Sequence, residues 1–143
     1  MTTKSGRIAK VELGGNRVAG LGTWTLGGFT REIIEEDSWD LDIKKKYFSV
    51  GDSGTITFGG LYDTLDVSGQ ALLNSACQNS SAFSGGLSST STLNFFIDNT
   101  SYWTVDSLGQ ILITKCKSIT LEKSAMGTVD FEAVVSGKHM VLI

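Results

Sequence analysis

The sequence predicts a mainly β fold with a single helix, on three observations. Across residues 129–135 apolar residues alternate with acidic ones, which is the period of two that a half-buried strand requires. The chain has 17 Gly and no Pro, so glycine must form the turns and no strand carries a ring that blocks pairing. Only residues 66–78 show a good apolar stripe at helical spacing. At this length we expect one domain over residues 1–143.

The N-terminal part predicts three strands. Residues 8–13 alternate in polarity and are followed by a Gly-Gly-Asn turn. Residues 20–28 are flanked by glycine and predict the second strand. Residues 29–36 follow a Gly-Gly pair and contain Thr and two Ile, which favours a third strand over a short helix.

A charged segment with embedded aromatic residues follows, EEDSWDLDIKKK at 35–46. Most charge runs are solvated loops. Large aromatic residues rimmed by charge are, however, typical of contact sites, and we interpret this segment as an interface. The candidate interface residues are Trp39, Asp40, Asp42, Lys44, Lys45, Lys46, Tyr47 and Phe48.

The middle of the chain predicts a strand, a helix and a loop. The strand covers residues 54–60. The helix, at about 66–78, has Asp66 or Ser68 as its cap, and its apolar stripe is expected to pack on a sheet rather than to hold a cofactor. Residues 78–92 are rich in Ser, Gly and Thr and predict a mobile loop.

The C-terminal part predicts two hairpins. The first joins strands at 93–98 and 102–106. The second is long, at 110–137, with a three-residue turn at 125–127 in which Gly127 supplies the left-handed conformation. This register pairs Leu121 with Phe131, Ile119 with Ala133 and Lys117 with Val135.

Two features of this C-terminal part predict contacts. Lys115 and Lys117 interrupt the apolar row of the long hairpin, so we expect its far half to pack against a neighbouring subunit. The apolar tail at 139–143 is expected to dock on its own domain or on a neighbour.

Composition argues against most ligand classes. The net charge of −3 disfavours tight nucleic-acid binding, because Lys and Arg supply its affinity. No run approaches the roughly 20 apolar residues of a membrane helix, and the first residues lack the apolar core of a secretory signal. Cys77 and Cys116 are expected to be small buried thiols without a disulfide.

The residues for common active sites are also missing. His139 is the only histidine, so neither a His-based metal cluster nor a typical Ser-His-Asp triad is expected. Asp63 and Asp66 could form a carboxylate pair, but Asp66 is better explained as a helix cap. We therefore predict no enzyme and no cofactor.

Five motifs follow one another in the last two-thirds of the chain: GTITFGGLYD at 54–63, GQALLNSA at 69–76, LNFFID, SYWTVD, and KSITLEKSAMGTVDFEAVVSGK at 117–138. In this order they resemble the tail tube proteins of long-tailed bacteriophages. Each motif alone is weak, and their order and spacing together carry the resemblance.

The resemblance implies a β-sandwich or half-barrel with one flanking helix. Six copies would form a ring in which their sheets join into a continuous inner β-barrel, and stacked rings would form a tube that conducts DNA. Type VI secretion tube proteins share that architecture. On this interpretation residues 36–52 form the long loop that contacts the next ring.

The resemblance also implies a setting and partners. The chain would lie in the tail of a virion, assembled in the bacterial cytoplasm. Its partners would be further copies of itself, the tape measure, baseplate and terminator proteins, and a sheath where the tail contracts. Because a conduit must not hold DNA, we expect a neutral to negative lumen. Asp130 and Glu132, opposite the Phe131 face, are candidates to line it.

Three alternatives stay open. The first is another tail component of the same fold, such as a baseplate ring or a tail terminator. The second is a monomeric carbohydrate-binding β-sandwich that uses Trp24, Trp39 and Trp103. The third is an enzyme with a carboxylate pair.

Overall fold

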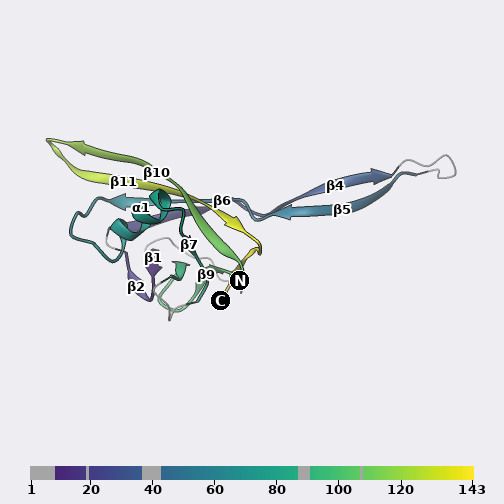
Figure 1. Cartoon of the computed structure of the whole chain (residues 1–143), viewed down its shortest axis with the longest axis horizontal. Helices are drawn as coiled ribbons and strands as arrows, with labels where there is room; N and C mark the ends of the chain where they lie inside the picture. Colours follow the sequence, from purple (N-terminus) through teal and green to yellow (C-terminus); the bar gives the residue numbers. More distant parts are fainter. Residues whose placement is uncertain (1–8, 19, 37–42, 87–90, 107) are drawn as a thin grey trace.

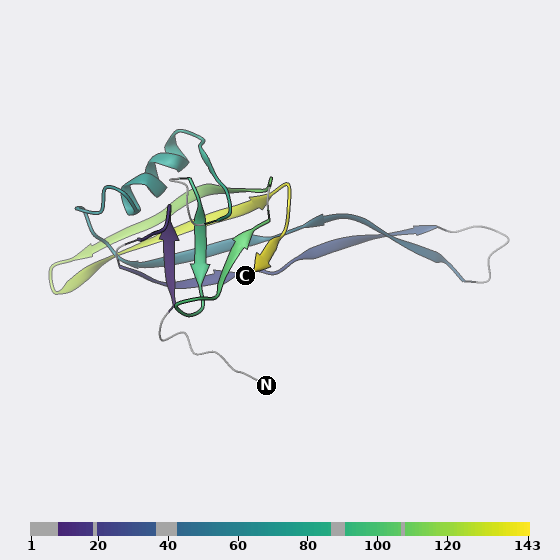
Figure 2. The same cartoon turned by 90° about the horizontal axis from the view of Figure 1, so that it is seen from below.

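A computed structural model describes residues 9–18, 20–36, 43–86, 91–106 and 108–143. Two five-stranded sheets form a sandwich, and a two-stranded arm extends from the body (Figure 1). The mainly β fold with one helix is as predicted. Seen from below, the arm projects well beyond the rest of the molecule (Figure 2).

The first sheet has the strand order β12-β9-β8-β1-β2. Its β1–β2 turn is Gly14-Gly15, and both residues have positive φ, 63° and 84°, as the tight hairpin turn matching strand twist requires. The tail forms β12, which pairs with β9, so it docks on its own domain. The strands are β1 (Lys10–Leu13), β2 (Asn16–Arg17), β8 (Leu93–Phe96), β9 (Tyr102–Val105) and β12 (Met140–Leu142).

The second sheet has the order β3-β6-β11-β10-β7. In β11 the burial pattern alternates, with Val129, Phe131, Ala133 and Val135 facing the core. The Phe131 ring stacks on Phe58 of β6 with 5.5 Å between centroids, which ties the middle strands together across the ladder. The strands are β3 (Leu21–Leu26), β6 (Thr55–Leu61), β7 (Ala82–Phe83), β10 (Gln110–Glu122) and β11 (Ala125–Ser136).

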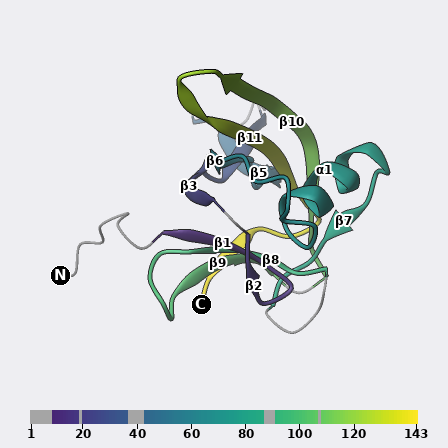
Figure 3. The same ribbon diagram turned by 90° about the vertical axis from the view of Figure 1, so that its left-hand side faces the viewer.

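The helix α1, Gln70–Gln78, lies beside β10 and covers one side of the sandwich (Figure 3). Leu73 and Ala76 are buried in the core. The helix starts later than predicted, because residues before Gln70 form a turn. The predicted cap Asp66 does contribute: its Oδ2 accepts the Gln70 N–H at 3.2 Å, although Gly69 is the N-cap residue.

The predicted register of the long hairpin is wrong. Glu122 pairs with Ala125, so the turn is Lys123-Ser124 and Gly127 lies within β11. Ile111 pairs with Val135, Ile113 with Ala133 and Ile119 with Val129. Register shifts between Ile113 and Lys115 and between Cys116 and Ser118 absorb extra residues of β10 as β-bulges, which a uniform alternation did not anticipate.

The predicted loop at 78–92 contains structure. Ala82–Phe83 form β7, which pairs with β10, and Phe83 is buried. Residues 87–90 lie outside the described residues.

The predicted loop at 36–52 is also wrong over its second half. Strand β5 (Lys45–Asp52) pairs antiparallel with β4 (Thr30–Glu36), which confirms the strand expected at 29–36. The adjacent residues Ile33 and Ile34 of β4 pair with Phe48 and Tyr47 of β5, and this apolar pairing outweighs the high charge of the segment. Residues 37–42, including Trp39, Asp40 and Asp42, lie outside the described residues.

Candidate assembly surfaces

The arm exposes apolar side chains on both of its faces. Ile33 pairs with Phe48 and Ile34 with Tyr47, so each face of the ribbon carries apolar groups. All four are exposed, and Phe48 has 74% of its surface accessible. A two-stranded hairpin is at best marginally stable alone in water, and exposed apolar patches of this kind mark contact sites. The arm therefore has the character of an interaction element.

Polar contacts within the arm engage several predicted interface residues. The Tyr47 hydroxyl donates a hydrogen bond of 2.8 Å to Glu36 Oε2, which raises the pKa of Tyr47 above its usual value. Glu35 accepts from Lys44 at 3.6 Å and from Lys46 at 3.9 Å. Exposed ion pairs of this type contribute about 0–1 kcal/mol, so these lysines stay available for another partner.

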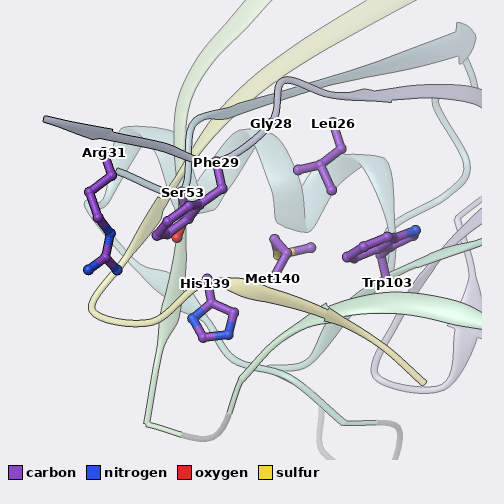
Figure 4. Close-up of a pocket in the computed structure, with 8 residues that line it drawn as sticks. All are labelled: Leu26, Gly28, Phe29, Arg31, Ser53, Trp103, His139 and Met140. Atoms are coloured by element: carbon purple, nitrogen blue, oxygen red, sulfur yellow. The ribbon is translucent and has the colours of Figure 1, made fainter. Parts of the chain in front are cut away.

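An apolar pocket lies at the base of the arm (Figure 4). Its volume is about 440 Å³. Phe29 contacts His139 edge to face at 5.9 Å, and the Arg31 guanidinium lies over Phe29 at 5.3 Å and over Phe48 at 5.7 Å. Its lining residues are Leu26, Gly28, Phe29, Arg31, Ser53, Trp103, His139 and Met140.

Sequence reasoning missed this pocket. Its walls come from β3, from the root of the arm, from β9 and from β12, which are far apart in the chain. The signal that could have helped was the apolar tail at 139–143, whose docking brings Met140 to the pocket.

The outward face of the second sheet is uncharged apart from a few groups. Thr23, Thr25 and Thr57 lie on it, opposite the core face. A broad depression over β3, β6 and β11 is lined by these threonines, by glycines and by Asp130. The lining of this depression therefore has small side chains and one acid, and it includes no Lys or Arg.

The candidate lumen residues share this outward face. Asp130 is exposed, with the Ser118 hydroxyl 3.4 Å from its Oδ2. Glu132 is half-buried, and its register partner is Lys115. The structure thus places Lys115 beside the candidate lumen residues. The backbone of Lys117 lies at the bulge between Cys116 and Ser118.

The second sheet has two incompletely paired margins. In the described part of the chain β3 pairs with β6 alone, and β7 pairs only with Ile111 and Leu112 of the long strand β10. Exposed strand edges present unpaired N–H and C=O groups that can pair with another chain. The two margins differ in sequence, so a contact between them would be head-to-tail.

The tip of the β10–β11 hairpin extends beyond the core (Figure 1). Ile119, Leu121 and Met126 are exposed there, with Met126 at 76%. This agrees with the expectation that the hairpin is longer than its own core, and its packing against a neighbour stays a prediction.

The alternative sites are engaged in structural contacts. Trp24 donates its Nε1–H to the Phe96 carbonyl at 3.0 Å, and its ring lies 5.8 Å from Phe95. Asp63 Oδ1 accepts the Leu65 N–H at 2.9 Å. These contacts explain Trp24 and Asp63 without a ligand.

Metal sites, membrane-spanning helices and the two cysteines are the remaining features of the described residues. Among the described residues, no group of three or more His, Cys, Asp or Glu could hold a metal ion. No helix in the described ranges is long and apolar enough to cross a membrane. Cys77 and Cys116 are free and half-buried, and partial burial raises the pKa of the Cys116 thiol.

Comparison with known proteins adds structural matches only. No protein-family model and no curated protein matches the chain. A chain in the virion of a native gene transfer agent particle is 11% identical, with a TM-score of 0.67 and 99% of both chains covered. A chain of an extracellular contractile injection system, in its extended sheath-tube complex, also has 11% identity and a TM-score of 0.67, covering 99% of this chain and 91% of that one.

A third match comes from the tube-terminating cap of an anti-feeding prophage. It is 11% identical with a TM-score of 0.66, and covers 100% of this chain and 92% of that one. At this identity the likeness concerns the fold, and it extends over almost the whole chain. The resemblance to phage tail tube proteins is thereby confirmed at the level of the fold, which this chain shares with proteins of gene transfer agent and contractile injection particles.

Proposed function

We propose that this chain is a structural tail protein, the subunit of a tube through which DNA passes. The observation that carries the proposal is the second sheet, which has two incompletely paired margins and an outward depression lined by Asp130 and by no Lys or Arg. The fold shared with tail and injection particles supports it.

Ring closure follows from the margins. When the β3 margin of one copy pairs with the β10 margin of the next, the contact is heterologous and closes where the rotation allows. Closing the sheets into one barrel removes the exposed edges. We propose six copies per ring, as in the tail tube proteins that the sequence resembles.

Stacking is assigned to the arm. The arm exposes apolar side chains on both faces, which a binding partner would bury. It also projects away from the body that would form the ring (Figure 2). In this role the arm bridges to the next ring, with Tyr47, Phe48 and the three lysines 44–46 at or near the contact.

The outward face of the second sheet becomes the lumen. Asp130 and Glu132 would repel phosphates, and the threonines would offer DNA no fixed charge to bind. A tube of this kind is a conduit rather than a catalyst. Its further partners would be the tape measure, baseplate, terminator and sheath proteins of a tail particle assembled in the bacterial cytoplasm.

A second candidate is a tube terminator or related ring of the same fold. Two of the structural matches come from a tube-terminating cap and from a sheath/tube terminator, and their TM-scores of 0.66 and 0.67 lie within the range of 0.63 to 0.67 of the other matches. A terminator forms a single ring at a tube end, so the two candidates differ in whether rings stack.

Electron microscopy of the purified chain separates these proposals. We expect long tubes, whereas single rings would favour the terminator and monomers would contradict both. Trp39→Ala, or Glu at positions 44–46 in place of Lys, should leave the monomer folded and abolish stacking. Tubes of normal length from these variants would show that the arm is not the stacking contact.

A further inference from the structure

The pocket at the base of the arm is shaped for an apolar group accompanied by negative charge. Leu26, Trp103 and Met140 border the space on one side and Phe29 on the other (Figure 4). Pockets of roughly 300 Å³ or more can hold drug-sized ligands, so the 440 Å³ here accommodates an indole. Arg31 brings a permanent positive charge to the lining, and its guanidinium can stack on Phe29 while its N–H groups face a carboxylate.

Charges near the pocket leave this preference intact. The adjoining depression holds Lys138 together with Asp52 and Asp106. Asp52 Oδ1 already accepts the Gly54 N–H at 2.8 Å. Asp52, Asp106 and Lys138 do not line the apolar cavity itself, whereas Arg31 does.

Three segments of the chain outside the described residues could fill the pocket, and their sequences differ sharply. Residues 1–8 carry Lys4 and Arg7 and no acid, so Arg31 would repel them. Residues 87–90, Leu-Ser-Ser-Thr, have neither charge nor an aromatic ring. Residues 37–42, Asp-Ser-Trp-Asp-Leu-Asp, combine three carboxylates with Trp39 and have no basic residue. Only this last segment matches both properties of the pocket.

The occupant must come from a second copy. Strand β4 starts at Thr30, next to the pocket residue Phe29, and runs outward to Glu36. Seven residues of strand span about 23 Å, so β4 leads away from the pocket toward Glu36 at the far end of the arm (Figure 1). Residues 37–42 come directly after Glu36 in the sequence. A pocket at one end of the arm and an occupant at the other make a head-to-tail contact that repeats from copy to copy, as open stacking requires.

We propose that residues 37–42 of one copy dock at the arm base of another, with the Trp39 side chain in the pocket and neighbouring carboxylates facing Arg31. The inference rests on the proposed tube function and names the surface that receives each arm. An indole enclosed by aromatic and aliphatic groups, beside an ion pair between Arg31 and a carboxylate, has the composition of an interface hot spot.

Photo-crosslinking tests directly whether position 39 of one copy lies in the pocket of another. The chain is made with p-benzoylphenylalanine at position 39, mixed with an equal amount of isotope-labelled unsubstituted chain, assembled and irradiated. We expect adducts between copies at residues 26–31 or 139–141. Tubes whose adducts lie elsewhere, for example at the β10–β11 tip or within one copy, would contradict docking of position 39 in the pocket. They would not contradict the tube function. Failure of the unsubstituted chain to form tubes would overturn both.

A pair of matched substitutions gives a second readout. Phe29 and Leu65 are both exposed, so Asp at either position should leave the monomer folded. Loss of a hot-spot contact should make Phe29→Asp raise the protein concentration needed for tube formation at least about tenfold. Leu65→Asp, outside the pocket, should leave that concentration unchanged. Equal behaviour of the two variants contradicts the proposal.

Discussion

At the scale of single residues, the join between β3 and β6 depends on a close backbone approach. Gly20 has φ of 73°, and a Cβ on Gly60 would collide with the Gly20 carbonyl oxygen. A Cβ on Gly20 would collide in turn with the Leu61 carbonyl. These atoms belong to backbone, which cannot move aside as a flexible side chain can, so only glycine fits at both positions.

We therefore expect Gly60→Ala to lower the free energy of unfolding by about 1–3 kcal/mol, the usual cost of overpacking. Gly22→Ala is the matched control in the same strand pair. Its Cβ would have Ala9 O as nearest atom at 3.9 Å, and its φ is not in the left-handed region. Urea unfolding followed by circular dichroism measures both. Equal stability of the two variants would show that the backbones can separate at little cost.

At the scale of elements, the arm is separable from the body. It consists of β4 and β5 paired only with each other among the described strands, and its side chains are almost all exposed. It joins the body through Gly27-Gly28 and Ser53-Gly54, where the Gly27 N–H donates to Thr55 O at 2.8 Å. The body needs little from the arm for its own core.

Excision of residues 29–52 should test this separation. Gly27-Gly28-Ser53-Gly54 would then be the turn between β3 and β6. We expect the free energy of unfolding to change little and rings to form without stacking into tubes. Negative-stain microscopy with urea unfolding gives both readouts. If the shortened chain still forms long tubes, stacking uses another surface, such as the exposed β10–β11 tip.

The elements themselves were largely predictable from local pattern. Alternation placed β11 and β6, glycine pairs placed the β1–β2 turn, and a single helical stripe placed α1, because each of these signals lies within one segment. The register of β10 against β11 was not predictable, because bulges near Thr114 and Lys117 change which residues face each other. The polarity pattern within one strand does not show where that strand has one more residue than the strand it pairs with.

The surfaces were predictable only in part. The aromatic and charged segment around Tyr47 and Phe48 signalled contact from sequence, and the structure shows both residues exposed on the arm. Its strand pairing was missed because acids and lysines dominate the local composition. The pocket could not be predicted, since Leu26, Trp103 and Met140 meet only through tertiary packing.

At the scale of the whole molecule, the sandwich has two unlike exteriors. The inner layers of both sheets pack on one core cluster that includes Val11, Phe95 and Phe131. Outside the second sheet lie threonines with Asp130 and Glu132, whereas outside the first sheet Lys10 and Glu12 form an ion pair of 3.2 Å. This asymmetry gives a ring of such subunits a distinct interior and exterior.

Neutralising the two acids that we propose for the lumen should impair transport without affecting assembly. We expect particles with Asp130→Asn and Glu132→Gln to form normal tubes and to release DNA more slowly, because repulsion between wall and phosphates is lost. Glu12→Gln removes one negative charge from the other exterior, and particles with this substitution should release DNA at the normal rate. The measurement is the rate of DNA release from purified particles. Unchanged release from the double variant would contradict a lumen role for these acids.

The docked C-terminus has a practical consequence for engineering. Ile143 exchanges backbone hydrogen bonds with Tyr102 at 2.9 and 3.3 Å, and β12 forms the outer margin of the first sheet. In the tube that we propose, a passenger protein fused after Ile143 would leave from the first sheet, on the side away from the lumen. Nanotubes built from this subunit could then display enzymes or antigens on their outer shell while the bore stays clear.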